Sequence, residues 1–164
     1  MKNGGLEEKK DRGNSATVGF SLTPTLYKIT WHGGNDEYVR CGADILLNGL
    51  QADLEGEAQC PVCGKKTQLV ISGGKIDGLE PRDAILHVVE VPTKSGRIWV
   101  ECESTHIFDK AICLQSWIST YQGKKGLVTS LEHYNNKIVE RESASRQPPK
   151  YAPQPRGGGT VKWQ

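Results

Sequence analysis

Residues 38–47 read YVRCGADILL and place Cys41 and Asp44 at what the pattern predicts to be the start of a helix. The apolar run after Asp44 is followed by Gly49, a residue typical of helix C-termini, so we predict a short helix over residues 43–50. Side chains three residues apart share one face of a helix. A thiol and a carboxyl group are therefore expected to reach the same bound atom.

A predicted β-hairpin leads into this stretch. Residues 27–32 alternate apolar and polar side chains, as a half-buried strand does, and residues 33–36 (GGND) supply a turn before residues 37–39 return. The hairpin is expected to deliver Cys41 to the start of the helix.

Strands dominate the chain beyond the helix. We predict them at residues 67–71, 85–91, 97–102 and 126–131, with the second and third paired across a turn at 93–96. Apolar residues at helical spacing predict one further helix, at 109–121. This order of elements indicates an α+β fold with a mixed or antiparallel β-sheet core and a few short helices.

Composition favours one domain that acts on a small substrate. The chain has 164 residues, of which 36% are hydrophobic, enough for one core. Its 21 basic and 19 acidic residues are interspersed, which gives no electrostatic footprint for nucleic acid or an acidic membrane. We expect a core at residues 18–141 between a disordered lead (1–17) and a disordered tail (142–164).

The five cysteines are expected to be free thiols. An odd number of cysteines in a chain without a signal peptide argues against a disulfide framework. The sequence has neither the apolar segment of a signal peptide nor the run of about 18 apolar residues that a membrane span needs, so we predict a cytoplasmic protein. Cys102 follows the apolar residues 98–100, and we expect it to lie near Cys41 in space. Two thiols and one carboxyl group would form a soft-metal site with a proton donor.

Three stretches resemble one family. Residues 41–44 (CGAD) are similar to the Cys-x-x-Asp of the organomercurial (alkylmercury) lyases, and Cys102 with residues 105–108 (THIF) resembles the second cysteine of that family. Residues 117–127 (WISTYQGKKGL) resemble the family's Trp-x-x-x-aromatic-Gln-Gly-x-x-Gly-Leu segment. The resemblance covers residues 26–135. It implies the catalytic core without the usual N-terminal helical domain, since only about 25 residues precede the first strand.

The resemblance implies cleavage of a carbon–mercury bond by protonolysis, giving a hydrocarbon and Hg(II) without a cofactor. Cys41 and Cys102 would be the thiolates that bind mercury as substrate and product, and Asp44 would lie against the metal as the general acid. We expect the helix N-terminus to lower the pKa of Cys41 and burial to keep Asp44 a competent acid. Low-molecular-weight thiols or a metal-handling protein would accept the Hg(II), in mercury detoxification and resistance.

A second cysteine motif lies at residues 60–64 (CPVCG), which has the form of a zinc knuckle. Structural zinc normally has two such pairs, and the other cysteines are single, so the motif does not favour a closed four-ligand site. A secondary metal site at Cys60 and Cys63, for capture or relay, and a redox pair both stay open.

The remaining notable side chains are expected to be structural. Cys113 falls on the apolar face of the second helix, and Trp99, Trp117 and Phe108 occupy apolar positions, which predicts core packing. For His106, a place beside Cys102 and a purely structural role both remain open.

Two other classes of function remain. A non-catalytic soft-metal binding protein could use the same thiols with Cys60 and Cys63 for mercury, copper or zinc. A zinc-stabilised interaction module could be built on the knuckle. Asp44 separates lyase from metal binder, because binding needs only sulfur whereas protonolysis needs an acid.

Overall fold

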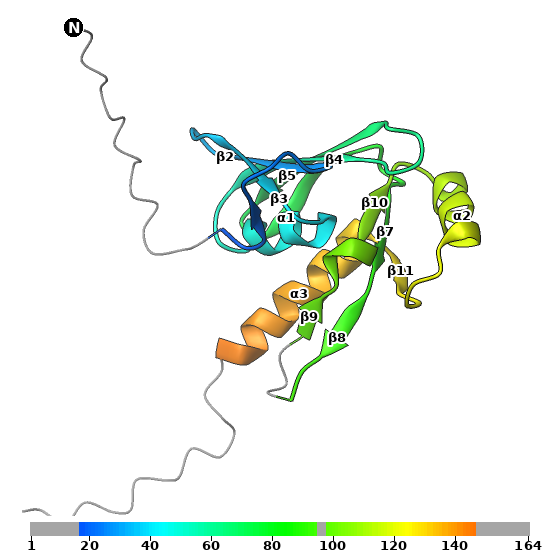
Figure 1. The fold of residues 1–164 in the computed structure, drawn as a ribbon. Helices are drawn as coiled ribbons and strands as arrows, with labels where there is room; N and C mark the ends of the chain where they lie inside the picture. Colours follow the sequence, from blue (N-terminus) through cyan, green and yellow to red (C-terminus); the bar gives the residue numbers. More distant parts are fainter. Residues whose placement is uncertain (1–16, 95–97, 147–164) are drawn as a thin grey trace, which may run out of the picture.

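The main layer of the molecule is a six-stranded antiparallel sheet (Figure 1), seen in a computed structural model that describes residues 17–94 and 98–146. Its spatial order is β1 (Phe20–Ser21), β3 (Asp36–Val39), β2 (Tyr27–Trp31), β4 (Leu54–Gln59), β5 (Lys66–Ser72) and β6 (Lys75–Glu80). Alternate residues of β5 are buried, namely Thr67, Leu69 and Ile71. This period of two gives the sheet one buried face.

Helix α1 (Gly42–Gly49) packs on that buried face, against β2, β3, β4 and β5. Its Ile45 lies so close to β4 that a Cβ on Gly56 would come within 2.5 Å of the Ile45 side chain. The small side chains of β4 therefore allow the helix to lie directly on the sheet. In Figure 1, α1 lies beneath the strands and faces the lower part of the molecule.

Two smaller antiparallel units complete the strand framework. One has the order β10 (His106–Phe108), β7 (Ile85–Val88), β11 (Leu127–Ser130), and the other pairs β8 (Glu90–Pro92) with β9 (Ile98–Val100). Helix α2 (Ala111–Thr120) packs against β10 and β7, whereas α3 (Leu131–Arg146) contacts β6 and β11. Figure 1 shows α2 on the outer side of β10 and α3 running below the main sheet.

The structure confirms the α+β class with antiparallel sheets, the hairpin of β2 and β3, and the helices α1 and α2. Five elements were not expected from the sequence: β1, β4, β6, β10 and α3. The predicted strand at 85–91 is divided between β7 and β8, and the predicted strand at 97–102 ends at Val100. Cys102 instead opens a 3₁₀ turn, η1 (Cys102–Ser104).

One packing prediction is wrong. Trp99 is 61% exposed, because β9 belongs to a two-stranded ribbon outside the larger sheets. Phe108 and Cys113 are buried as expected, and Trp117 packs against them. The predicted domain boundary at residue 141 falls inside α3, while residues 1–16 and 147–164 of the predicted lead and tail lie outside the described residues.

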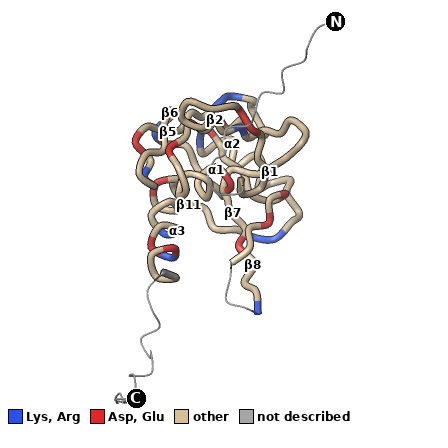
Figure 2. The backbone as a smooth tube through the Cα atoms, turned by 90° about the vertical axis from the view of Figure 1, so that its left-hand side faces the viewer, with Lys and Arg blue, Asp and Glu red and all other residues tan. Residues whose placement is uncertain are grey.

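Acidic and basic residues are scattered over the described backbone, without a face of one sign in the view of Figure 2. None of the helices in residues 17–94 and 98–146 has both the length and the apolar composition that a membrane span requires.

Candidate active site

Cys41 is the residue at which the hairpin becomes a helix. It is the N-cap of α1, with extended backbone (φ −152°, ψ 172°), and its side chain is fully buried. Its backbone N–H donates a hydrogen bond to Oδ2 of Asp44 at 3.2 Å. A carboxylate at the third helical position thus satisfies a backbone donor at the helix start, as in a capping box.

Cys102 reaches the same carboxylate from the other side of the fold. Its Sγ donates to Oδ2 of Asp44 at 3.5 Å, although the two residues are 58 positions apart. The two sulfurs and a carboxylate oxygen of Asp44 all lie within 4.8 Å of one another. Cys41 and Asp44 are buried, whereas Cys102 is only partly covered. The three residues selected from the sequence are therefore together in space.

Burial controls the protonation of this group. Desolvation raises the pKa of Asp44, although contacts with Cys102, Arg40 and Cys41 oppose it. The pKa of Cys41 is also raised, first by its hydrogen bond with Cys102 and then by burial and the nearby Asp44 charge. The expectation that the helix N-terminus lowers the Cys41 pKa is wrong, because these effects outweigh the helix dipole.

Two histidines hold the η1 turn that carries Cys102. Nδ1 of His87 lies 2.7 Å from the carbonyl oxygen of Ser104, and Nε2 of His87 accepts from the N–H of Gly126 at 3.2 Å. Nε2 of His106 lies 3.0 Å from the carbonyl oxygen of Glu103. Carbonyls only accept, so both rings must donate to η1.

The contact of the second ring nitrogen, Nδ1, is consistent with a neutral His106 ring. Nδ1 lies 2.7 Å from the hydroxyl of Tyr27, which donates to it when the ring is neutral. Burial lowers the pKa of His106, and this favours the neutral ring. The sequence left open whether His106 lies beside Cys102 or is purely structural. In the structure it has a structural role, which is to hold the turn that carries Cys102.

The segment before β1 closes over Asp44. Gly19 has φ +69°, and a Cβ there would lie 2.0 Å from Oδ2 of Asp44. The buried Asn48 holds this segment, since its side chain accepts from the N–H of Val18 and donates to the Val18 carbonyl. Asn48 also donates to the Asp44 carbonyl at 2.7 Å. Sequence reasoning missed both residues, although Asn48 stands one helical turn after Asp44.

Comparison with known proteins identifies the family of this chain. A family model described as alkylmercury lyase matches residues 20–137, a range that contains Cys41, Asp44 and Cys102. The chain belongs to the alkylmercury lyase family.

One solved structure has a similar fold. The crystal structure of the mercury-bound form of MerB2 aligns with a TM-score of 0.58 and 22% sequence identity, covering 75% of this chain and 62% of that chain. At this identity the likeness supports the fold alone. A search of curated proteins gives no match.

The alkylmercury lyase match also contains a second cluster of metal-ligand type. Cys60 and Cys63 lie with Asp109 and Cys113, and their ligand atoms are all within 4.8 Å of one another. This cluster shares no residue with the first one. Asp109 was missed from the sequence, although its spacing of four residues from Cys113 places both on one side of a helix start.

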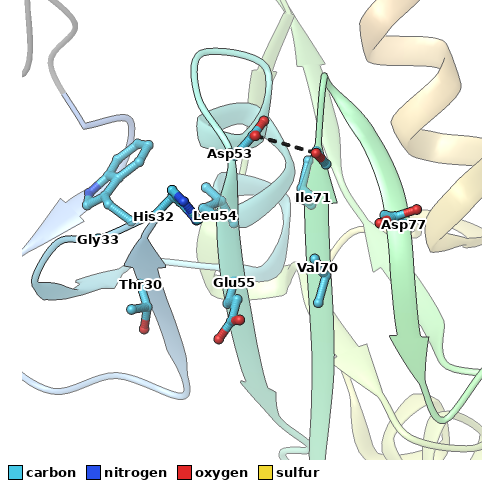
Figure 3. A pocket seen from close by; sticks show the side chains of 11 residues that line it. Thr30, His32, Gly33, Asp53, Leu54, Glu55, Val70, Ile71 and Asp77 are labelled. Carbon is cyan, nitrogen blue, oxygen red and sulfur yellow. Dashed lines mark hydrogen bonds between the residues drawn. The ribbon is translucent and has the colours of Figure 1, made fainter.

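A surface hollow lies elsewhere on the fold. It has a volume of about 300 Å³ and is lined by residues of β2, β4, β5 and β6 with their turns, including His32, Asp53 and Asp77. Figure 3 shows these side chains on the strands, with Asp53 accepting a hydrogen bond from Ser72. Because no cysteine lines it, we do not assign the lyase chemistry to this hollow.

Proposed function

We propose that this member of the alkylmercury lyase family cleaves carbon–mercury bonds by protonolysis with Cys41, Cys102 and Asp44. The observation that carries the proposal is the approach of two thiols and one buried carboxyl group within 4.8 Å. Thiolates are the protein ligands that soft metals prefer. The carboxyl group adds the proton donor that metal binding alone does not need.

The substrate meets Cys102 first, because Cys102 is partly exposed and Cys41 is fully buried. The Cys102 thiol exchanges with the ligand opposite carbon on mercury, so an S–Hg bond forms and the displaced ligand leaves with the thiol proton. The organic group remains on mercury, now held beside Cys41 and Asp44.

Cys41 then becomes the second sulfur ligand. Its raised pKa keeps it protonated at rest, so its proton must move as mercury binds. The nearby Asp44 carboxylate takes this proton, while the Cys41 thiolate adds electron density to mercury and weakens the bond to carbon. No electron leaves the system in this step.

Asp44 finally gives the proton to carbon. An aspartic acid with the ordinary pKa of about 3.9 would rarely hold a proton at neutral pH, but desolvation raises the pKa of Asp44. The carbon–mercury bond breaks, the hydrocarbon leaves and Hg(II) stays on the two sulfurs. Two external thiols then remove the Hg(II), from small molecules or a metal-handling protein.

A reducing compartment such as the cytoplasm suits this cycle, because both cysteines must be free thiols at its start. In that setting the reaction would serve detoxification and mercury resistance. Mercury is substrate and product here, and the cycle uses no other cofactor.

Hydrocarbon release tests the proposal. The purified protein is incubated with an organomercurial and excess small thiol, and the gas phase is analysed for wild type, Cys41→Ser, Cys102→Ser and Asp44→Ala. Asp77→Ala is the matched control, because Asp77 is an exposed aspartate on β6.

Release by wild type and the control, and its loss in the other three variants, is the expected result. Tight binding by folded wild-type protein with no release would instead favour a soft-metal binding protein. Unchanged release by Cys41→Ser or Cys102→Ser would exclude the two-thiol mechanism.

A further inference from the structure

The second cysteine cluster lies where the sheet meets α2. Cys60 directly follows β4 and Cys63 lies in the turn after it, while Asp109 lies just before α2 and Cys113 lies in its first turn. No step proposed for the lyase reaction uses these side chains. Together they supply three sulfurs and one carboxylate, which are ligand types that zinc binds, and four protein ligands are the number that closed structural zinc sites use.

The contacts converge on the Asp109 carboxylate. Sγ of Cys63 donates to Oδ1 of Asp109 at 3.0 Å, and the thiols of Cys60 and Cys113 also contact this carboxyl group. Asp109 is only 6% exposed. Thiols are weak hydrogen-bond donors, whereas a divalent cation would pair its charge directly with the buried carboxylate.

The size of the cluster suits one zinc ion. With Zn–S bonds of about 2.3 Å and Zn–O bonds of about 2.0–2.2 Å, the ligand atoms of a tetrahedral site with three sulfurs and one oxygen lie about 3.5–3.8 Å apart. The ligand atoms of this cluster all lie within 4.8 Å of one another, so small side-chain movements suffice to close it. Four protein ligands would leave no open position for a substrate.

The backbone of residues 60–65, the turn that carries Cys60 and Cys63, also suits a metal site. The N–H of Gly64 donates to the Cys60 carbonyl at 3.0 Å, and Gly64 has φ +74°, which glycine adopts without strain. The N–H of Lys65 contacts the Cys63 sulfur. Outer hydrogen bonds of this kind orient metal ligands and stabilise negative sulfur.

We propose that Cys60, Cys63, Asp109 and Cys113 bind one structural zinc ion that fastens the turn between β4 and β5 to the start of α2. The site completes a small second core made of Cys60, Phe108, Cys113 and Leu114, on which Trp117 packs. Trp117 in turn contacts the rings of His87 and His106. Zinc would thereby steady the helix behind the two histidines that hold η1.

The metal content of the purified, reduced protein tests this proposal. Zinc per chain is measured by mass spectrometry after desalting for wild type, Cys63→Ser and Asp109→Asn. Cys63 is exposed, so its replacement by serine is expected to leave the fold intact, which circular dichroism checks. Cys41→Ser and Cys102→Ser are matched controls, since they change thiols of the other cluster.

About one zinc ion per chain is expected in wild type and both controls, with loss in Cys63→Ser. Cobalt(II) replacement should give the strong absorption of a tetrahedral sulfur site, weakened in Cys63→Ser and altered in Asp109→Asn. The proposal would be overturned by reduced wild-type protein that takes up neither metal, by equal zinc in Cys63→Ser, or by zinc that is lost only in the Cys41 and Cys102 variants. None of these results depends on carbon–mercury cleavage.

Discussion

Asp44 has two roles that its place in α1 makes compatible. As the third residue of the helix it accepts the backbone N–H of Cys41, and the same oxygen accepts the Cys102 thiol. A carboxyl group held in this way has few other orientations. Its position beside both sulfurs is thus fixed before substrate arrives, which lowers the entropic cost of proton transfer.

Gly19 offers a test of this fixed position. Gly19→Ala should displace the Asp44 carboxyl group, because the new Cβ would lie 2.0 Å from Oδ2. We expect hydrocarbon release to fall by about 100-fold, the cost of a misplacement near 1 Å. The free energy of unfolding should fall by roughly 1–3 kcal/mol, since alanine is strained at positive φ.

Gly33→Ala is the matched control for this substitution. Gly33 also has positive φ, at +66°, but no atom lies within 4 Å of its would-be Cβ. It should share the backbone strain and keep the rate of release. Equal losses of activity in both variants would show that closeness to Asp44 is not the cause.

At the scale of residues, the sequence predicted the features that depend on local spacing or on the family resemblance. Cys41 and Asp44 could be paired from helical spacing, whereas the expectation that Cys102 lies near them had no local basis and gained its support from the family resemblance. Asp109 and Cys113 joined the knuckle only in the structure, because nothing local to residues 60–64 reveals that α2 begins beside them. The Cys41 pKa was mispredicted since burial and the Cys102 contact are tertiary effects.

Among the elements, η1 is the one that decides where Cys102 lies. A 3₁₀ turn of three residues has too few internal hydrogen bonds to be stable alone. His87 and His106 stabilise η1 by donating hydrogen bonds to its carbonyl groups. The sequence predicted a strand here because residues 98–100 are apolar. The strand ends at Val100, and the N–H of Glu101 still bonds to the Val89 carbonyl before the chain turns into η1.

The histidine contacts predict a pH effect. Burial lowers the folded-state pKa of His106 below the unfolded value of about 6.5. Its stabilising effect is therefore complete above that unfolded value and is lost as pH falls through the lower folded value. Thermal unfolding between about pH 7 and pH 5 should show decreasing stability in wild type and a flatter profile in His106→Gln.

His32→Gln is the control for this measurement, because His32 is exposed on the turn after β2. Its profile should follow that of wild type. If His106→Gln retained the full pH dependence, another group would be responsible for it.

Four strands and one helix escaped prediction, and β4 and α3 show why: small or polar residues weaken their apolar patterns. In β4 the buried positions are Leu54, Gly56 and Ala58, and small residues carry little strand signal. In α3 the buried residues Leu131, Tyr134 and Ile138 do follow helical spacing. The polar residues between them hid this pattern.

Over the whole molecule, α3 closes the core that positions the site. Leu131, Tyr134 and Ile138 belong to the same buried cluster as Cys41 and Ile45. Arg141 forms a two-pronged ion pair with Glu90, with contacts of 2.7 Å and 3.2 Å, which ties the helix to β8. Helix α3 is thus an integral part of the lyase-like fold.

The contribution of α3 can be measured with one substitution. Ile138→Ala should lower the free energy of unfolding by about 2–5 kcal/mol, because Ile138 is 5% exposed and its truncation leaves a cavity. Ile112→Ala on α2 is the control and should change it by less than about 0.5 kcal/mol, since Ile112 is 62% exposed. Urea unfolding gives both values, and equal small changes would contradict the packing of α3.

The central claim is that Asp44 supplies the proton that releases carbon from mercury. Its most direct test is a single turnover, in which stoichiometric organomercurial is mixed with wild type or Asp44→Asn and bound organomercurial and free hydrocarbon are both followed over time. The account predicts that both proteins bind the compound and that Asp44→Asn releases hydrocarbon about 10²–10⁴-fold more slowly, the usual loss for a general acid. Equal rates of release in the two proteins would contradict it.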